Sequence, residues 1–334
     1  MFEDLSAYAH SEDKRLKVLF IAGEGRSGST IIGDILGQID GFFSVGELFY
    51  IWDRGLIQNW RCSCGLSFEE CPVWSEVIAR AFGSKSQVNA EKLLGMRDRL
   101  HTRHLLPIPA RKDPQERMAQ MGEYREALAR LYHAVQSVTG SGVLVDGSGY
   151  PAQAYVLQTM PSIELYVLHL VRDSRAVVYS STARKKKVEA DLERKHDHYM
   201  GSDSLLVSSL LWDMYCSVIE RAWGDNSQRY ALLRYEDFAE NPKATIEGCL
   251  RFLDEERSEL PFVSDREVLL GVTHTFSGNP ARFRHGSRVI RIDDEWKSKM
   301  SRLQRALVTT ATFPWLMRYR YPLFIRNEVQ IDTS

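Results

Sequence analysis

The chain has 334 residues, of which 44% are hydrophobic and 26% charged, as in an ordinary globular protein. Its formal net charge of −1 excludes a strong overall attraction to nucleic acid or to an anionic membrane, so an anionic ligand must be held by a local group of basic side chains. The absence of an apolar run of membrane-spanning length and the acidic, polar character of residues 1–15 predict a cytoplasmic protein with a flexible N-terminal segment.

Short apolar runs alternate with helical patterns along the chain. Buried strands are expected at 17–24, 42–47, 142–147, 164–171 and 230–235. Helices are expected at 30–39, 119–139, 174–182, 203–223, 241–254 and 297–311. This alternation predicts an α/β fold, with a parallel β-sheet flanked by helices on both faces.

A single domain over residues 1–334 is the simplest organisation, because no repeat, low-complexity tract or Pro/Gly-rich linker divides the chain. Residues 85–140 carry helical signals without strand signals, which indicates a helical insertion. Residues 184–201 are almost wholly polar, and we expect a mobile loop or a frayed helix there.

The sequence GEGRSGST (residues 23–30) lies between the first strand and the following helix, where a phosphate-binding loop belongs. Gly23, Gly28 and Thr30 have P-loop spacing, but Ser29 occupies the lysine position of a nucleoside triphosphatase. Free N–H groups at a helix N-terminus bind phosphate, and Arg26 adds a two-pronged cationic donor. A purely structural turn is the alternative.

A second strand runs into a helix at LHLVRDSRAVVYSST (residues 168–182). Arg172 stands at the end of the strand, and Ser180 lies about two turns into the helix. Ligands of open α/β sheets bind at the carboxyl ends of the strands, so this pair could hold a second phosphate in the same crevice as the loop. The alternative is an N-cap with an Asp–Arg pair.

The two segments GRSGST and LVRDSRAVVYS together resemble the sulfotransferase family that uses 3′-phosphoadenosine 5′-phosphosulfate (PAPS), in its bacterial, carbohydrate and tyrosyl-protein types. The resemblance implies a P-loop NTPase-like sulfotransferase fold without a bound metal. It also implies that Arg172 and Ser180 hold the 3′-phosphate. The 5′-phosphosulfate would be cradled by Arg26, Ser27, Gly28, Ser29 and Thr30.

Two later segments extend the resemblance. LLRYEDFAENPKATI (residues 232–246) is similar to a family segment that would place Tyr235 near the adenine. HTFSGNPARFRHG (residues 274–286) is similar to a C-terminal loop of bacterial members, in which Arg282 and Gly286 would close over the 3′-phosphate.

Sulfuryl transfer to a hydroxyl needs a base for the acceptor proton and donors for the developing charge. Glu47, in FFSVGELFY, is the base that the resemblance implies, and a paired structural glutamate is the alternative. Arg26 would stabilise the leaving phosphate. In VDGSGYP (residues 145–151), relatives often have a lysine where this chain has Gly149, whereas Ser148 is still available as a donor.

The histidines and the aromatic residues after Glu47 leave alternatives open. His169 is expected to pack within its strand, and His274 and His285 are possible ligand contacts. Four aromatic residues could line the acceptor site or could pack in the core: Phe49, Tyr50, Trp52 and Trp60.

Three cysteines lie close together in CSCGLSFEECPVW, namely Cys62, Cys64 and Cys71. A similar pattern recurs in bacterial members of the family. A closed zinc site needs four ligands, and only three thiols are local. We therefore expect packing cysteines or one local disulfide, and no metal.

The sequence thus predicts an enzyme that transfers the sulfuryl group of PAPS to a hydroxyl of a carbohydrate, lipid or small-molecule natural product, leaving adenosine 3′,5′-bisphosphate. The alternatives are a non-catalytic nucleotide-binding protein of the same fold and an atypical P-loop kinase. The expected partner is the acceptor and not a nucleic acid, and the sequence indicates no oligomeric state.

Overall fold

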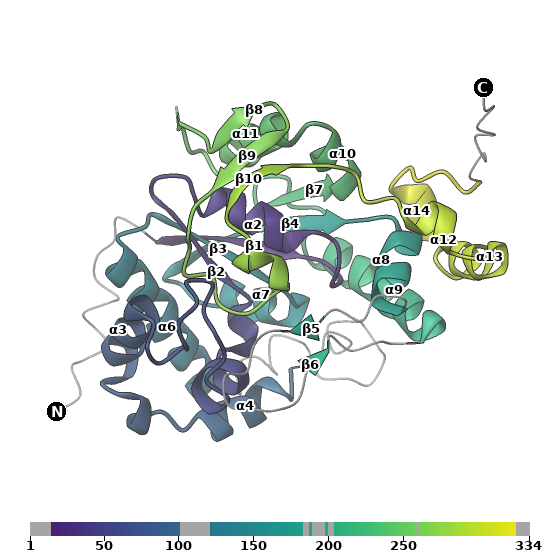
Figure 1. Ribbon diagram of the computed structural model, residues 1–334. Helices are drawn as coiled ribbons and strands as arrows, with labels where there is room; N and C mark the ends of the chain where they lie inside the picture. Colours follow the sequence, from purple (N-terminus) through teal and green to yellow (C-terminus); the bar gives the residue numbers. More distant parts are fainter. Residues whose placement is uncertain are drawn as a thin grey trace.

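Five parallel strands form the central sheet (Figure 1). They are β1 (Leu16–Ala22), β2 (Phe42–Gly46), β3 (Val143–Gly149), β4 (Ile163–Val171) and β7 (Tyr230–Arg234). Their order is β2-β3-β1-β4-β7, and every neighbouring pair is parallel. All five coincide with the apolar runs, so the predicted α/β fold is confirmed. The computed structural model describes residues 15–100, 121–182, 187–188, 198–199, 204–257 and 259–324.

Helices connect the strands and surround the sheet (Figure 1). The longer ones are α2 (Ser29–Leu36), α3 (Pro72–Phe82), α4 (Ala90–Arg97), α6 (Gly122–Thr139), α7 (Pro151–Gln158), α8 (Ser174–Thr182), α9 (Leu205–Trp223), α11 (Pro242–Phe252) and α13 (Arg302–Ala311). The shorter ones are α10 (Tyr235–Glu240), α12 (Trp296–Lys299), α14 (Phe313–Arg318), the 3₁₀ turns η1 (Leu48–Tyr50), η3 (Lys85–Gln87) and η5 (Pro280–Phe283), and the π-helical turn η2 (Ile51–Ile57).

The side chains of β1 alternate between two buried clusters, one on each face of the sheet. Val18 and Phe20 pack with residues of α3, α6, α7 and α9. Leu19 and Ile21 pack with residues of α2, α10 and α11. Because both faces are covered, the strand is apolar from Val18 to Ala22, as is usual for a parallel sheet. The carboxyl ends of the strands are thereby held in a fixed arrangement.

A small antiparallel sheet in the C-terminal third has no counterpart among the predicted elements. Its strands, in the order β10-β9-β8, are β8 (Phe262–Ser264), β9 (Glu267–Leu270) and β10 (Gly286–Val289). Val268 and Leu270 of β9 join the buried cluster around α2. This sheet therefore fastens the chain before and after residues 271–285 to the main body, which lets that connecting segment lie across the site described below.

The helix predicted at 297–311 is two helices, α12 and α13. The break falls at Ser301, whose side chain accepts a hydrogen bond from the Gln304 backbone while the Gln304 side chain accepts one from the Ser301 backbone. This reciprocal capping box begins a new helix.

Three stretches of the chain were given a structural prediction as a whole, namely residues 1–15, 85–140 and 184–201. Among the described residues of 85–140, the regular elements are the helices η3, α4 and α6, and an insertion there stays a prediction. The segment 184–201 was predicted to be a loop or a frayed helix, but it contains the paired strands β5 (Lys187–Val188) and β6 (His198–Tyr199). Residues 1–14 lie outside the described residues, so the flexible N-terminus stays a prediction. No helix in the described residues has both the length and the apolar character needed to cross a membrane.

Candidate functional site

The loop between β1 and α2 packs against the start of α10. Gly28, the residue before α2, has φ +103°, and a Cβ atom there would lie 2.6 Å from the ring of Tyr235. A residue with a side chain would be strained in this conformation and would push the ring away. The glycine therefore allows the loop and Tyr235, 207 positions apart in the chain, to stay in contact, and the N-terminus of α2 is directed into the same region.

The structure brings the loop together with the second predicted phosphate anchor. Arg26 Nη2 donates a hydrogen bond to the backbone carbonyl of Ser180 (3.2 Å). Arg172 Nη1 donates to the backbone carbonyl of Arg26 (3.0 Å). Two guanidinium groups, a helix N-terminus and Ser180 thus lie in one cluster at the carboxyl ends of β1 and β4. Such a concentration of positive charge in a protein of net charge −1 suits a ligand with more than one phosphate.

Arg172 also contacts Tyr235 and Asp293. Its guanidinium lies 4.6 Å from the centre of the Tyr235 ring, and its Nη2 is 2.8 Å from the Asp293 carbonyl oxygen and 3.3 Å from the carboxylate. Its Nε is buried and has no hydrogen-bond partner in the structure. A buried donor of this kind is expected to find an acceptor. Asp293 is a site residue that no sequence signal singled out.

The rest of the VRDSR segment has a structural role. Asp173 and Arg175 form a buried pair in which Arg175 Nε and Nη2 donate to the two carboxylate oxygens (2.9 and 2.6 Å). Ser174 bonds Thr312 (2.7 Å). The Asp–Arg pair proposed as an alternative is therefore present, but it involves Arg175 and leaves Arg172 directed toward the loop.

Glu47 directly follows β2 and precedes the turn η1. Its carboxylate lies 3.1 Å from Arg54 Nη1 and accepts a hydrogen bond from Ser277 Oγ (3.3 Å). Arg54 Nη1 also donates to Ser277 Oγ (2.7 Å), so the three side chains form a closed group. Burial raises the pKa of Glu47, although Arg54 and Arg282 oppose the shift. About a quarter of the side chain remains accessible, at 23% exposure. A carboxylate with a raised pKa is suited to accept a proton.

Glu47 and the phosphate loop lie on two sides of Gly278. A Cβ atom on Gly278 would be 3.6 Å from Thr30 Oγ1 and 3.7 Å from Glu47 Oε1. Asn279 N donates to Thr30 Oγ1 (3.4 Å), and Glu47 N donates to the Phe276 carbonyl (2.9 Å). The segment 276–279 therefore bridges the two predicted parts of the site, a connection that separate sequence motifs could not reveal.

The aromatic residues after Glu47 divide between the site and the core. Trp52 is fully buried and packs against Phe82 and Tyr124, so it belongs to the core. Arg54, which the sequence analysis did not select, stacks over the rings of Tyr50 (3.4 Å) and Trp60 (4.7 Å). It comes from the π-helical turn η2, a rare conformation that occurs frequently at functional sites.

Ser148 supports the turn that follows Glu47. Its Oγ accepts a hydrogen bond from Phe49 N (3.0 Å), and its own N–H donates to Asp146 (2.8 Å). The neighbouring Gly149 has φ +82°, and a Cβ atom there would lie 2.9 Å from the Gly23 carbonyl oxygen. Gly149, which departs from the family pattern, thus lies in close contact with the phosphate loop. Donation by Ser148 to a transferred group stays a prediction.

Arg282 and Gly286 do not join the Arg172 cluster within the described residues. Arg282 is 2% exposed and donates to the carbonyls of Gly278 (2.9 Å) and Arg61 (3.3 Å), and burial lowers its pKa to about 10. Gly286 pairs with Leu270 at the start of β10. In this structure Arg282 stabilises the segment around Gly278, and closure over a 3′-phosphate stays a prediction for both residues.

The three histidines considered as packing residues or ligand contacts, His169, His274 and His285, have separate environments. His169 is buried in β4, where it bonds the Tyr230 hydroxyl (2.9 Å), and burial lowers its pKa to about 3, as expected of a packing residue. His285 Nδ1 is 3.1 Å from the Gly271 carbonyl. His274 lies beside Cys62 and Cys71 rather than in the phosphate cluster.

Comparison with known proteins identifies the family and the fold of the chain. A model of the sulfotransferase family matches residues 19–259. No curated protein sequence matches significantly. Among solved structures, the sulfotransferase domain of the Synechococcus PCC 7002 olefin synthase is 19% identical, covers 93% of this chain and 97% of its own, and superposes with a TM-score of 0.54. A sulfotransferase domain from the curacin biosynthetic pathway is 16% identical, covers 94% and 100%, and gives 0.51. These two structures support the fold, and the family model, which spans more than half of the chain, shows that the protein belongs to the sulfotransferase family.

Proposed function

We propose that the protein transfers the sulfuryl group of PAPS to an acceptor hydroxyl. The observation that carries this proposal is the hydrogen bond between Arg172 and the Arg26 carbonyl, which unites the two predicted phosphate anchors. A nucleotide with phosphates on both its 5′ and 3′ sides would contact each anchor once. A nucleoside triphosphate would have no use for the second anchor, and the loop lacks the lysine that such a ligand requires.

Three groups would bind the nucleotide. The N–H groups from Ser27 to Thr30 and the Arg26 guanidinium would hold the 5′-phosphosulfate. Arg172 would hold the 3′-phosphate, with its buried and unpartnered Nε as an available donor, and Ser180 would assist. The Tyr235 ring, already in contact with Gly28 and Arg172, would flank the adenine.

Transfer then needs one proton acceptor and one in-line displacement. The acceptor oxygen attacks sulfur, the bond between sulfur and the 5′-phosphate oxygen breaks, and the hydroxyl proton moves to the Glu47 carboxylate. The products are a sulfate ester, protonated Glu47 and adenosine 3′,5′-bisphosphate. Arg26 and the loop N–H groups would stabilise the charge on the leaving phosphate. Arg54 and Ser277 would orient Glu47, since both contact its Oε2.

The acceptor would approach from the aromatic side of Glu47. Phe49 stacks on Tyr150 at 4.1 Å, and the hydroxyls of Tyr50 and Tyr150 are 2.6 Å apart. Aromatic rings with hydroxyl groups suit the apolar faces and the hydroxyls of a carbohydrate, a lipid head or a small natural product. This surface supports a hydroxyl-bearing acceptor and does not distinguish among these three classes.

Calorimetric titration tests the nucleotide assignment. The protein is expected to bind adenosine 3′,5′-bisphosphate without added metal and to bind ATP with Mg²⁺ weakly. Preferential binding of ATP with Mg²⁺ would overturn the proposal in favour of a kinase. Tight bisphosphate binding without turnover of PAPS on carbohydrate, lipid and phenolic acceptors would favour a non-catalytic binding protein.

A further inference from the structure

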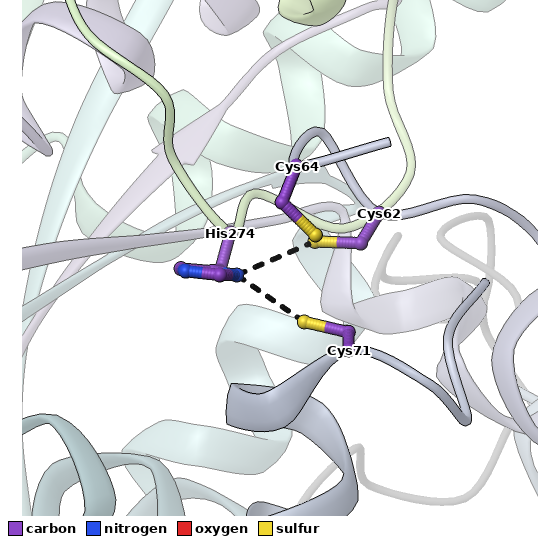
Figure 2. A group of neighbouring side chains, drawn as sticks. All are labelled: Cys62, Cys64, Cys71 and His274. Atoms are coloured by element: carbon purple, nitrogen blue, oxygen red, sulfur yellow. Dashed lines mark hydrogen bonds between the residues drawn. The ribbon is translucent and has the colours of Figure 1, made fainter. Parts of the chain in front are cut away.

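Three thiols and one imidazole meet in a cluster that lies beside the Glu47 group. The cluster consists of Cys62, Cys64, Cys71 and His274 (Figure 2). Their sulfur and nitrogen atoms all lie within 4.8 Å of one another. His274 Nδ1 is 3.2 Å from Cys71 Sγ and 3.9 Å from Cys62 Sγ. Figure 2 shows the ring of His274 and the three sulfurs directed toward a common centre.

These separations match the edges of a zinc tetrahedron. With Zn–S of about 2.3 Å and Zn–N of about 2.0–2.1 Å, neighbouring ligand atoms in a tetrahedral site are roughly 3.5–3.8 Å apart. Of the two nitrogen–sulfur distances, that to Cys71 (3.2 Å) is slightly below this range and that to Cys62 (3.9 Å) slightly above it. Thiolate sulfur and imidazole nitrogen in a tetrahedral arrangement favour zinc over magnesium or calcium, which prefer oxygen ligands.

We propose that Cys62, Cys64, Cys71 and His274 bind one zinc ion in a closed Cys₃His site. The sequence around the cysteines predicts no metal, because it offers three thiols and no fourth ligand. The fold supplies that ligand from a position 203 residues beyond Cys71. The site is separate from the proposed sulfuryl transfer and does not depend on it.

The backbone holds the two ligand-bearing segments together without the metal. Cys62 pairs with Phe276 in an isolated antiparallel bridge, and Ser63 N donates to the Thr275 carbonyl (3.1 Å). Ser63 Oγ donates to the Thr273 carbonyl (2.7 Å). His274 is therefore fixed opposite the cysteines by contacts on both of its flanks. Such preorganisation favours metal binding, because little chain entropy is lost when the ion is taken up.

Cys71 is held at the start of a helix, and Trp74 of that helix contacts His274. Cys71 is the residue immediately before α3, so the positive end of that helix faces its sulfur, together with the N–H groups of Val73 and Trp74. The Trp74 indole N–H donates to the His274 carbonyl (2.8 Å). Outer contacts of this kind orient the ligands of metal sites. Trp74 thus connects the helix that follows Cys71 to the segment that carries His274.

The other two cysteines differ clearly from this cluster. Cys216 and Cys249 are buried in separate apolar clusters, which is where packing cysteines are usually found. All five cysteines are free thiols in the structure, so the alternative of a local disulfide has no support there. Cys249 therefore provides a matched control, being buried and free but remote from the proposed ligands.

A closed set of four protein ligands gives the zinc a structural role, since no position is open for a substrate. The ion would join residues 62–71 to the segment that continues through Phe276 and Ser277. Phe276 accepts a hydrogen bond from Glu47 N, and Ser277 donates to the Glu47 carboxylate. The zinc would therefore stabilise one wall of the Glu47 site from behind.

Metal analysis of the full chain is the first test. The protein, purified without chelator from zinc-supplemented cells, is expected to contain one equivalent of zinc per chain by plasma mass spectrometry. Replacement by Co²⁺ should produce the visible bands of tetrahedral cobalt and the near-ultraviolet charge-transfer bands of cysteine thiolates. A protein that contains no zinc, that contains iron instead, or that binds Co²⁺ without thiolate bands would overturn the assignment.

Single substitutions test the ligand set. Cys64→Ser and His274→Ala should each weaken zinc binding, as measured by competition with a chromogenic chelator. Loss of a contact outside the ligand shell costs about 10–100-fold in metal affinity, and loss of a ligand should cost more than that. Cys249→Ser should retain wild-type zinc affinity. Retention of zinc with unchanged affinity in Cys64→Ser or His274→Ala would contradict the Cys₃His site. If a ligand variant does not fold, the cobalt spectrum of the wild-type protein still decides the question.

Discussion

Arg172 Nη1 donates a hydrogen bond of 3.0 Å to the backbone carbonyl of Arg26, 146 positions earlier in the chain. This contact joins the end of β4 to the loop that follows β1, the two neighbouring strands at the middle of the sheet. Because both residues lie at the carboxyl ends of parallel strands, the fold itself makes them neighbours.

Glu47→Gln should strongly slow sulfuryl transfer and leave nucleotide binding unchanged. The amide can keep hydrogen bonds to Arg54 and Ser277 but cannot accept the acceptor proton. A loss of about 10²–10⁴-fold in kcat is expected for removal of a general base. The measurement is the rate of bisphosphate formation from PAPS with an acceptor that supports wild-type turnover.

Glu76→Gln is the matched control for this substitution, because Glu76 lies on the exposed side of α3 and pairs with Arg80 one turn away. It should retain full turnover. Wild-type turnover by the Glu47→Gln variant would remove Glu47 from the mechanism. Loss of nucleotide affinity together with turnover would instead indicate a structural glutamate.

Substitution of Gly149 by lysine, the residue common in relatives at this position, should not increase turnover. With φ +82° and only 2.9 Å between a Cβ atom and the Gly23 carbonyl oxygen, any side chain strains β3 and displaces the loop. Gly149→Ala and Gly149→Lys should both lower the free energy of unfolding by at least about 1–2 kcal/mol. Denaturant unfolding measures the effect.

Gly147→Ala provides the comparison within the same strand. Its nearest neighbour for a Cβ atom is the Gly46 carbonyl oxygen at 3.5 Å, an ordinary contact. This variant should be less destabilised than Gly149→Ala. If Gly149→Lys were as stable as the wild type and more active, the conformation of Gly149 would not be a constraint, and the lysine would be functionally equivalent to that of relatives.

Much of this architecture was predictable from the sequence for a physical reason. Strands buried on both faces, such as Leu16–Ala22, are apolar at almost every position, and that pattern is visible locally. The phosphate loop and Arg172 were also predictable, since a strand, a turn and a helix N-terminus follow one another directly in the chain. Their contact then follows from the parallel order of the strands.

The contacts made by residues 271–293 were not predictable in the same way. Ser277 reaches Glu47 across 230 positions, and Asp293 reaches Arg172 across 121. Neither residue belongs to a regular element whose periodicity would indicate its direction. His274 was considered as a ligand contact, but its actual partners, Cys62 and Cys71, became evident only when the fold placed them together.

Asp34→Asn should stabilise the protein at neutral and alkaline pH. Asp34 is buried in α2, its Oδ1 has no hydrogen-bond partner in the structure, and burial raises its pKa from 3.8 to about 7. The folded state therefore binds the proton more tightly than the unfolded chain does. The contribution of Asp34 to stability is highest below about pH 4 and is lost as the pH rises to about 7.

The gain from Asp34→Asn at pH 8 is at most roughly 4 kcal/mol, at 1.36 kcal/mol per pKa unit, and should shrink toward pH 4. Denaturant unfolding at a series of pH values measures it. Asp40→Asn, at an exposed position just after the same helix, is the control and should change the free energy of unfolding little. An Asp34→Asn variant that is less stable than the wild type at pH 8 would show that the ionised carboxylate is stabilised by Arg282 and Arg288.

Asp293→Asn should strengthen binding of adenosine 3′,5′-bisphosphate. The Asp293 carboxylate lies 3.3 Å from the Arg172 guanidinium, where it would compete with a 3′-phosphate and repel it. Removal of one negative charge at this distance should raise affinity by about 5–10-fold at low salt, with a smaller effect at high salt. Calorimetry at two salt concentrations measures both effects.

Asp294→Asn removes the adjacent charge, which pairs with Lys297 at the surface, and should change affinity little. Weaker binding by Asp293→Asn than by the wild type would mean that the Asp293 side chain orients Arg172 for the ligand rather than competing with it.

The most direct test of the central claim is the affinity difference between adenosine 3′,5′-bisphosphate and adenosine 5′-monophosphate, measured by calorimetry in the wild type and in Arg172→Ala. If Arg172 binds the 3′-phosphate, removing that phosphate should weaken wild-type binding by about 10²-fold or more, as expected for a charge-assisted pair, and should hardly affect the variant. Arg26→Ala should weaken both ligands equally. An equal preference for the bisphosphate in wild type and Arg172→Ala would contradict the two-anchor site.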